Sequence, residues 1–186
     1  MGKRAKTNKC SRVQKWWTDQ WQSFRAWQEN PMRYKMDYKL TEDGLYAYQY
    51  PRASVTADAV LFAEKDGQLY VLLIQRGNEP YKGCWAFPGG FLNMDETVAC
   101  CAERELEEET GIVLTGMQLV GVYSDVERDP RGRVITAAYT AMTTMPEATA
   151  ADDAAAAKWW PLKELPPLAF DHDKILADAK RVLNID

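Results

Sequence analysis

The chain has 186 residues, 46% of them hydrophobic, and a formal net charge of −4. This length suits one ordinary domain, and the apolar content excludes an intrinsically disordered chain. Residues 1–40 hold ten Lys or Arg and three Asp or Glu, so the remainder must carry −11 to give the total of −4. Because nucleic-acid binding needs a broad basic face, the acidic body argues against it, and we expect no nucleic-acid partner.

The cysteines and the hydropathy of the chain indicate the cellular compartment in which we expect the protein. None of the four cysteines forms a C-x-x-C pair, and the adjacent Cys100 and Cys101 are badly placed for a mutual disulfide. We interpret all four, Cys10 and Cys84 included, as reduced thiols. No apolar run approaches the length of a membrane span, and no apolar core of a signal peptide follows the basic N-terminus. We therefore expect a cytoplasmic protein with no membrane partner.

The first 40 residues differ from the rest of the chain. Residues 1–12 are polar and charged, and residues 13–28 place aromatic side chains near helical spacing: Val13, Trp16, Trp17, Trp21, Phe24 and Trp27. Such a helix suits packing on the body or on a second subunit, or binding to a membrane surface. Alternatively, translation starts at Met32 or Met36. We expect a basic, Trp-rich arm over 1–40, partly helical or flexible, and one domain over 41–186.

The middle of the chain predicts a hairpin followed by a helix. Residues 54–63 and 69–74 have the composition of buried strands, and Asp66-Gly67 between them is a hairpin-turn dipeptide. A loop rich in Gly and Pro covers residues 77–90. A helix is then predicted from Glu96 to Thr110, ended by Gly111.

The remaining pattern alternates strands and loops before a last helix. Strands are predicted at 119–123, 134–141 and 158–160, and a charged loop joins the first two. Asp171 is placed to cap the final helix. Strands with helices on either side indicate a three-layer α/β fold.

The predicted helix at 96–110 carries an unusual charge pattern. Glu105, Glu108 and Glu109 share one side of it, where like charges repel and the helix dipole disfavours anions. Cations would relieve both effects, and carboxylate oxygens suit Mg²⁺ or Mn²⁺. Arg104 is placed to orient one carboxylate, and Glu96 lies near the favourable helix start. Taken alone, the glutamates also fit a solvated acidic helix end.

The full spacing resembles the Nudix box at every fixed position: Gly90-x5-Glu96-x7-Arg104-Glu105-Leu106-x-Glu108-Glu109-x-Gly111-Ile112. The resemblance implies the Nudix fold, a mixed β-sheet between α-helices with the box as a loop–helix–loop. It implies that Glu105, Glu108, Glu109 and the carbonyl of Gly89 bind Mg²⁺ or Mn²⁺, and that Arg104 and Glu96 hold the site in shape. The implied reaction is attack of water on a nucleoside diphosphate linked to another group.

The general base of this family is not tied to one position. We rank Glu108 first, then the loop acids Glu127, Asp125 and Asp129, then Asp152 and Asp153. For any single loop acid, an exposed charge without a catalytic role is the plainer interpretation.

The segments around the box favour one branch of the family. Residues 76–91 and 122–132 are similar to segments of ADP-ribose pyrophosphatases, and residues 166–172 to a segment of that branch and of related transcription regulators. We expect Arg76 and Arg131 to bind phosphates. Trp85 is our candidate for stacking on adenine, with Tyr81 and Tyr123 as alternatives; each also fits core packing. His172 is expected to cap or pack at the last helix.

We therefore expect a hydrolase that converts ADP-ribose to AMP and ribose 5-phosphate. Oxidised nucleoside triphosphates or other nucleotide sugars are alternative substrates. A regulator that binds ADP-ribose without cutting it is an alternative of another class, disfavoured by the intact box and by the short segment after His172. Relatives in this branch pair into homodimers, which we expect here too.

Overall fold

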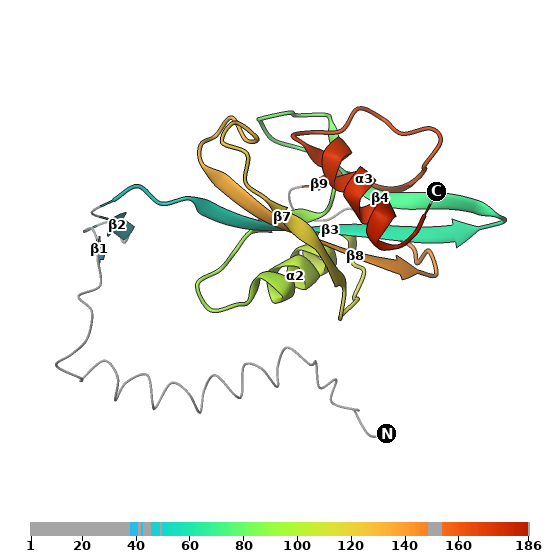
Figure 1. Cartoon of the computed structure of the whole chain (residues 1–186), viewed down its shortest axis with the longest axis horizontal. Coiled ribbons are helices and arrows are strands. Elements are labelled where there is room, and N and C mark those ends of the chain that lie inside the picture. Colours follow the sequence, from blue (N-terminus) through green and yellow to red (C-terminus); the bar gives the residue numbers. More distant parts are fainter. Residues whose placement is uncertain (1–37, 41, 43–45, 49, 149–153, 186) are drawn as a thin grey trace, which may run out of the picture. The chain divides into compact units, whose positions relative to one another are not determined.

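The computed structural model describes residues 38–185 apart from 41, 43–45, 49 and 149–153 (Figure 1). The chain divides into two compact units, Met1–Arg52 and Ala53–Asp186. In the first unit, β1 (Tyr38–Leu40) and β2 (Tyr46–Tyr48) form an antiparallel pair. The helix predicted at 13–28 lies outside the described residues, so its role and the boundary at 40/41 stay predictions.

The second unit begins with the predicted hairpin. Strand β3 (Ser54–Lys65) pairs with β4 (Gln68–Arg76), and Lys65 faces Gln68 across a two-residue turn. The turn residues Asp66 and Gly67 have φ values of 52° and 72°. Positive φ at both positions matches the right-handed twist of the strands, which is why this dipeptide closes a hairpin.

The hairpin is the centre of a mixed, seven-stranded sheet. The strands β3 and β8 are parallel, and all other pairs are antiparallel. The hydrogen-bonded order is β5 (Trp85–Ala86), β4, β3, β8 (Val134–Thr143) and β7 (Gln118–Tyr123), while β6 (Gly89–Phe91) pairs with β3 and β9 (Ala154–Pro161) with β4. Strand β9 starts earlier than predicted, because alanines of the Ala-rich stretch join the edge of β4.

Two helices cover opposite faces of this sheet (Figure 1). Val60 and Phe62 of β3 pack with Ile175 of α3 (His172–Val182). Leu61, between them, packs with Leu106 of α2 (Val98–Thr110) on the other face. Alternate residues of a strand point to opposite sides, so β3 supplies both cores. The predicted three-layer α/β arrangement is confirmed.

The ends of the two helices can be compared with the ends predicted from the sequence. Helix α2 starts two residues later than predicted, because Thr97 is its N-cap and accepts a hydrogen bond from the Cys100 amide at 3.2 Å. It ends at Gly111, whose φ of 71° is the left-handed conformation that glycine tolerates. The predicted capping role of Asp171 is wrong: it occupies the N-cap position of α3, but its side chain makes no capping hydrogen bond.

Two further expectations concern the cysteines and membranes. Cys84 and Cys101 are free thiols, whereas Cys100 is disulfide-bonded, so the expectation of four reduced thiols is wrong for Cys100. Neighbouring side chains on a helix point about 100° apart, and Cys101 is buried in the core while Cys100 is only partly buried. Neither described helix is long and apolar enough to cross a membrane.

Leu106 anchors the carboxylate-bearing helix to the sheet. It is fully buried among Leu61, Leu72 and Trp159, and we expect Leu106→Ala to lower the free energy of unfolding by about 2–5 kcal/mol through lost burial and a cavity. Urea denaturation checks this. Val113→Ala, at a position that is 65% exposed, is the control and should change stability by less than about 0.5 kcal/mol. Equal effects of the two substitutions would contradict the anchoring role.

Candidate active site

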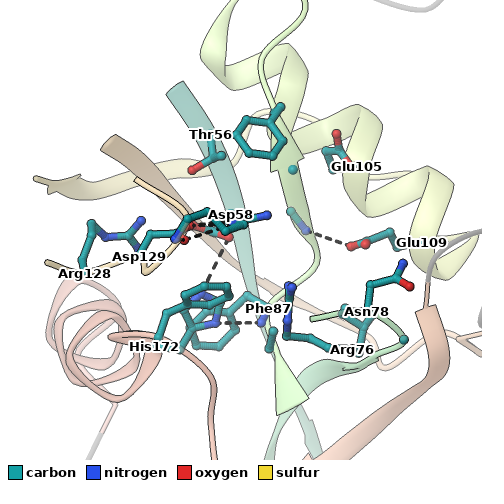
Figure 2. A pocket seen from close by; sticks show the side chains of 18 of the residues that line it. Thr56, Asp58, Arg76, Asn78, Phe87, Glu105, Glu109, Arg128, Asp129 and His172 are labelled. Carbon is teal, nitrogen blue, oxygen red and sulfur yellow. Dashed lines mark hydrogen bonds and ion pairs between the residues drawn. The ribbon is translucent and has the colours of Figure 1, made fainter. Parts of the chain in front are cut away.

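A cavity of about 380 Å³ opens where β3 changes its pairing partner. Residues 62–65 of β3 pair with β4, whereas residues 56–58 pair with β6. The two partners separate between these registers, and the Ala59 amide donates to the Pro88 carbonyl at 2.8 Å. Figure 2 shows Glu105 and Glu109 on one side of the cavity, with Arg128, Asp129 and His172 on the other and Asp58 between them.

Arg104 gathers three carboxylates of the box. Its Nη2 and Nε donate to Glu96 at 2.7 and 3.0 Å, and its Nη1 donates to Glu105 at 2.7 Å and to Glu108 at 2.8 Å. Burial acts to raise the pKa of Glu96, but hydrogen bonds from Arg104 and the Asn93 amide bring it below its ordinary value. The same carboxylates hold the pKa of Arg104 above its ordinary value, against the effect of burial. The expected proximity of Arg104 and Glu96 is therefore observed, and it links the loop before α2 to the helix.

Glu105 lies directly over the glycine pair of β6. A Cβ atom on Gly90 would sit 2.4 Å from Glu105 Oε1, so any larger residue here would displace the carboxylate. Only 14% of the Glu105 side chain is exposed. Burial raises the pKa of Glu105 despite the hydrogen bond from Arg104. The Glu105 carboxylate is thus held in a tight space, and its negative charge is only partly neutralised.

Glu109 is the carboxylate of the box whose negative charge is least stabilised by its described contacts. Its Oε2 accepts a hydrogen bond from the Gly89 amide at 2.9 Å. Burial raises its pKa to about 8, and the negative charges of Glu105 and Asp58 add to the effect, while the Gly89 hydrogen bond and Arg76 oppose it. A bound cation would remove this penalty and leave the carboxylate ionised.

The predicted ligand atoms are all oxygens, the type of ligand that a hard divalent cation prefers. Gly89, Glu105 and Glu109 line the cavity, and Glu108 lies beside Glu105 on the same Arg104 nitrogen. Among the described residues, no three Asp, Glu, His or Cys side chains converge as a ready cluster. The Arg104 guanidinium bonds two of the predicted ligands, Glu105 and Glu108. Two under-neutralised carboxylates beside a glycine backbone nevertheless offer oxygen ligands only, the type that such a cation prefers.

The cavity lining also contains a carboxylate that the sequence did not single out. Asp58 of β3 is 8% exposed and accepts a hydrogen bond from Thr136 Oγ1 at 2.5 Å. His172 Nε2 lies 3.9 Å from Asp58 Oδ1, and His172 Nδ1 accepts from the Phe87 amide at 3.0 Å. Burial lowers the pKa of His172, and its ring stacks on Phe87 with centroids 4.8 Å apart. The expected packing role of His172 is confirmed.

The candidate loop acids are in different surroundings. Asp129 is 4% exposed, lines the cavity and accepts hydrogen bonds from Arg131 Nη2 at 2.7 Å and Nε at 3.0 Å. Burial acts to raise the pKa of Asp129, but the bonds from Arg131 bring it below its ordinary value. Asp125 is exposed and pairs with Lys174, and Glu127 is exposed outside the cavity lining. Asp152 and Asp153 lie outside the described residues.

The two predicted phosphate-binding arginines do meet in this cavity. Arg76 and Arg131 both line it, and their guanidinium carbons lie 4.8 and 5.5 Å from the ring centroid of Phe170. Burial, and then repulsion by Arg131, lower the pKa of Arg76. Two cations this close, in a partly buried site, favour an anionic ligand.

The aromatic side chains named as adenine-stacking candidates lie elsewhere. Trp85 packs edge-on against Trp160 at 5.0 Å and is not among the residues that line the cavity. Its backbone bonds to Pro167 and Ala169, which precede Phe170. Tyr123 donates to Asp178, and Tyr81 packs on Phe170. Phe170 was missed, because its residue type and loop position gave no signal.

The raised pKa of Glu109 predicts how stability depends on pH. The folded chain binds this proton more tightly than the unfolded chain, whose glutamate has the ordinary value of 4.5. Without a cation, this stabilisation is complete below 4.5 and lost as pH rises through about 8. We expect Glu109→Gln to remove most of this slope in thermal unfolding with EDTA, raising the melting temperature at alkaline pH by at least about 5 °C.

Two controls accompany this measurement. Glu107→Gln, at an exposed position of the same helix, should keep the wild-type slope. Mg²⁺ should stabilise the wild type more at alkaline than at acidic pH, because it competes with the proton. Parallel melting curves for wild type and Glu109→Gln across this range would show that Glu109 is ionised throughout.

Comparison with known proteins identifies the family. Residues 53–179 match the NUDIX domain family. An ADP-ribose pyrophosphatase of Methanocaldococcus jannaschii is 44% identical over 135 residues, which cover 73% of this chain and 78% of that one. The ADPR responsive transcriptional repressor NtrR of Acinetobacter baylyi is 34% identical over 161 residues, 82% of this chain but only 64% of the repressor.

A solved structure agrees with the sequence matches. The NUDIX domain of Shewanella oneidensis NrtR, in complex with ADP ribose, is 36% identical with a TM-score of 0.69, covering 72% of this chain and 90% of that one. Its similarity confirms the expected fold, and the match over 53–179 confirms the resemblance of the box. The chain belongs to the NUDIX domain family and is a Nudix pyrophosphohydrolase.

Proposed function

We propose that the protein hydrolyses ADP-ribose to AMP and ribose 5-phosphate with the help of Mg²⁺ or Mn²⁺. The observation that carries this proposal is one cavity lined by carboxylates and guanidiniums together: Glu105 and Glu109, here called the acidic wall, and Arg76 and Arg131, here called the basic wall. A substrate with a diphosphate needs both, because a cation on the acidic wall and guanidiniums on the basic wall would share its charges. The similarity to an ADP-ribose pyrophosphatase and to a domain that binds ADP ribose supports the choice of substrate.

Glu105, Glu108, Glu109 and the carbonyl of Gly89 would hold the cation. When bound, it would neutralise phosphate oxygens and make a water molecule more acidic. Arg104 would keep Glu105 and Glu108 in position, since one nitrogen, Nη1, already bonds both carboxylates. Its bonds to Glu96 tie this arrangement to the loop before α2.

The proton of the attacking water needs a carboxylate acceptor. Glu108 is our first candidate, because 48% of its side chain is exposed and a single described hydrogen bond, from Arg104, occupies its carboxylate. Asp129 lies in the cavity, but Arg131 satisfies both of its oxygens. Glu127 stays a weaker candidate, because it lies outside the cavity lining.

Two other functions remain testable alternatives. Oxidised nucleoside triphosphates or other nucleotide sugars would use the same cation and phosphate contacts. A regulator that binds ADP-ribose without cutting it is suggested by the similarity to the repressor of Acinetobacter baylyi. The homodimer, the cytoplasmic location and the absence of nucleic-acid and membrane partners also remain proposals.

The first experiment compares substrates directly. The protein and Mg²⁺ are incubated with ADP-ribose, NADH and an oxidised dGTP at equal concentration, and products are separated by chromatography. We expect AMP release from ADP-ribose, and a fall in kcat/KM of about 10²-fold or more for Glu109→Gln, because the cation loses a charged ligand. Glu107→Gln, the same change on an exposed face of the same helix, should retain wild-type activity.

Each alternative has its own outcome. Turnover of the oxidised triphosphate alone would keep the reaction class and overturn the substrate. Binding of ADP-ribose without cleavage of any compound would favour the regulator. Equal activity of Glu109→Gln and Glu107→Gln would overturn the assignment of the acidic wall.

A further inference from the structure

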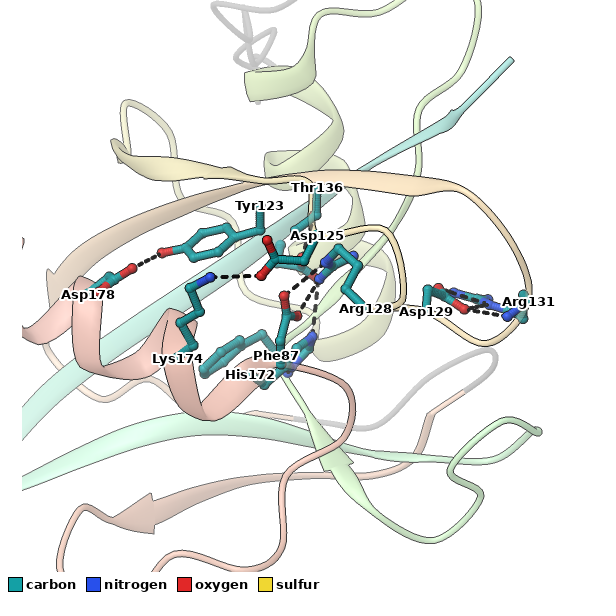
Figure 3. A network of polar contacts seen from close by, with 12 residues as sticks. Phe87, Tyr123, Asp125, Arg128, Asp129, Arg131, Thr136, His172, Lys174 and Asp178 are labelled. Carbon is teal, nitrogen blue, oxygen red and sulfur yellow. Dashed lines mark hydrogen bonds and ion pairs between the residues drawn. The ribbon is translucent and has the colours of Figure 1, made fainter. Parts of the chain in front are cut away.

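Three polar contacts fasten the loop after β7 to one face of α3. Tyr123 donates to Asp178 at 2.8 Å, Lys174 to Asp125 at 2.9 Å, and Arg128 bonds Asp171 (Figure 3). The three α3 positions, 171, 174 and 178, are spaced so that they share one helix face. The contacts run in reverse order along the loop, so the loop lies against the start of the helix.

Only one of the three contacts is both buried and bidentate. Arg128 Nη2 and Nε donate to the two oxygens of Asp171 at 2.6 and 3.0 Å. The side chains are 4% and 17% exposed, whereas those of Lys174 and Asp125 are 56% and 73% exposed. Parallel hydrogen bonds to a carboxylate fix the guanidinium in orientation as well as in distance. This explains why Asp171 does not cap α3: its carboxylate is committed to Arg128.

Arg128 and chain neighbours of the pair line the cavity, whereas Asp171 is not among the lining residues. Asp129 follows Arg128 and holds Arg131, while Phe170 precedes Asp171. Arg131 then reaches across to Phe170, with its guanidinium carbon 5.5 Å from the ring centroid. The Arg128–Asp171 pair and the Arg131–Phe170 contact therefore join the same two segments, within three residues on one of them and at adjacent residues on the other.

Phe170 in turn contacts both cations of the basic wall. Arg76 lies 4.8 Å from its ring centroid, and the ring faces offset part of the repulsion between the guanidiniums. Phe170 has a φ of 53°, a conformation that costs energy for a bulky residue and persists only when its surroundings impose it. Asp171, the next residue, is held by Arg128.

We infer that Arg128 and Asp171 form a positioning pair that holds Phe170 and the Asp129–Arg131 unit together, and thereby sets the two guanidiniums for binding a diphosphate. The inference rests on the proposed function for the identity of the substrate. It adds a specific division of labour: the pair governs binding of the anion, and because Asp171 is not among the cavity-lining residues, an effect of Asp171→Asn separates positioning from a direct contact of Arg128 with the substrate. Loss of the pair should therefore raise KM and leave kcat nearly unchanged.

The test uses the full chain with Arg128→Lys, Asp171→Asn and the control Lys174→Gln. Arg128→Lys keeps the positive charge but loses the two parallel N–H donors of the guanidinium. It therefore tests the geometry of the pair even if Asp171→Asn folds poorly. Lys174→Gln removes an exposed contact from the same helix face. We expect KM for ADP-ribose to rise about tenfold in the first two variants, with kcat within about twofold of wild type. Lys174→Gln should match wild type in both constants.

A second readout does not depend on cleavage of ADP-ribose. Inorganic pyrophosphate should raise the melting temperature of wild type and Lys174→Gln, and clearly less that of Arg128→Lys and Asp171→Asn. If ADP-ribose is not cut but this difference is seen, the proposed substrate fails and the positioning pair stands. Equal pyrophosphate shifts in all four proteins, no shift in wild type, or a loss confined to kcat would overturn the pair.

Discussion

The structure depends on an imbalance of charge at the C-terminal end of α2. This helix ends with Glu105, Glu108 and Glu109 and has no basic residue in its last turn, although the helix dipole already makes that end negative. Arg104 supplies one positive charge and bonds Glu96, Glu105 and Glu108. Glu109 receives only an amide hydrogen bond among its described contacts. The remaining negative charge is the physical basis on which we propose a divalent cation at this site.

Packing keeps the helix in place despite this repulsion. Leu106, next to Glu105 in the chain, is fully buried against β3 and β4, and burial of a leucine side chain contributes about 1.5–3 kcal/mol. The glycines of β6 then let the carboxylates approach the backbone closely, since a side chain at Gly90 would overlap Glu105. Apolar anchoring on one face and missing side chains on the other thus fix a charge arrangement that an isolated helix would avoid.

Local patterns and long-range contacts differ in how well the sequence predicts them. The Asp66-Gly67 turn and the end of α2 at Gly111 follow from backbone conformations that few residues adopt, so they could be predicted from neighbours in the chain. Asp58 and Phe170 could not. Asp58 sits within a buried strand and becomes part of the cavity only through pairing with β6, and Phe170 meets Arg76 across 94 positions of sequence. Asp171 was assigned a capping role because the pattern could not reveal Arg128 as its competing partner.

The two arginines of the basic wall each have a local partner. Arg76 Nε donates to the Pro80 carbonyl at 2.8 Å, and Arg131 is bonded to Asp129. Neither arginine forms a described ion pair with Glu105 or Glu109, although Glu109 lies near enough to influence the pKa of Arg76. If the arginine side chains were free to move, attraction would draw them towards Glu105 and Glu109, where they would occupy the place of the proposed cation. These carbonyl, carboxylate and aromatic contacts are compatible with the proposed function, in which a cation and the diphosphate that it binds would need separate places in the cavity.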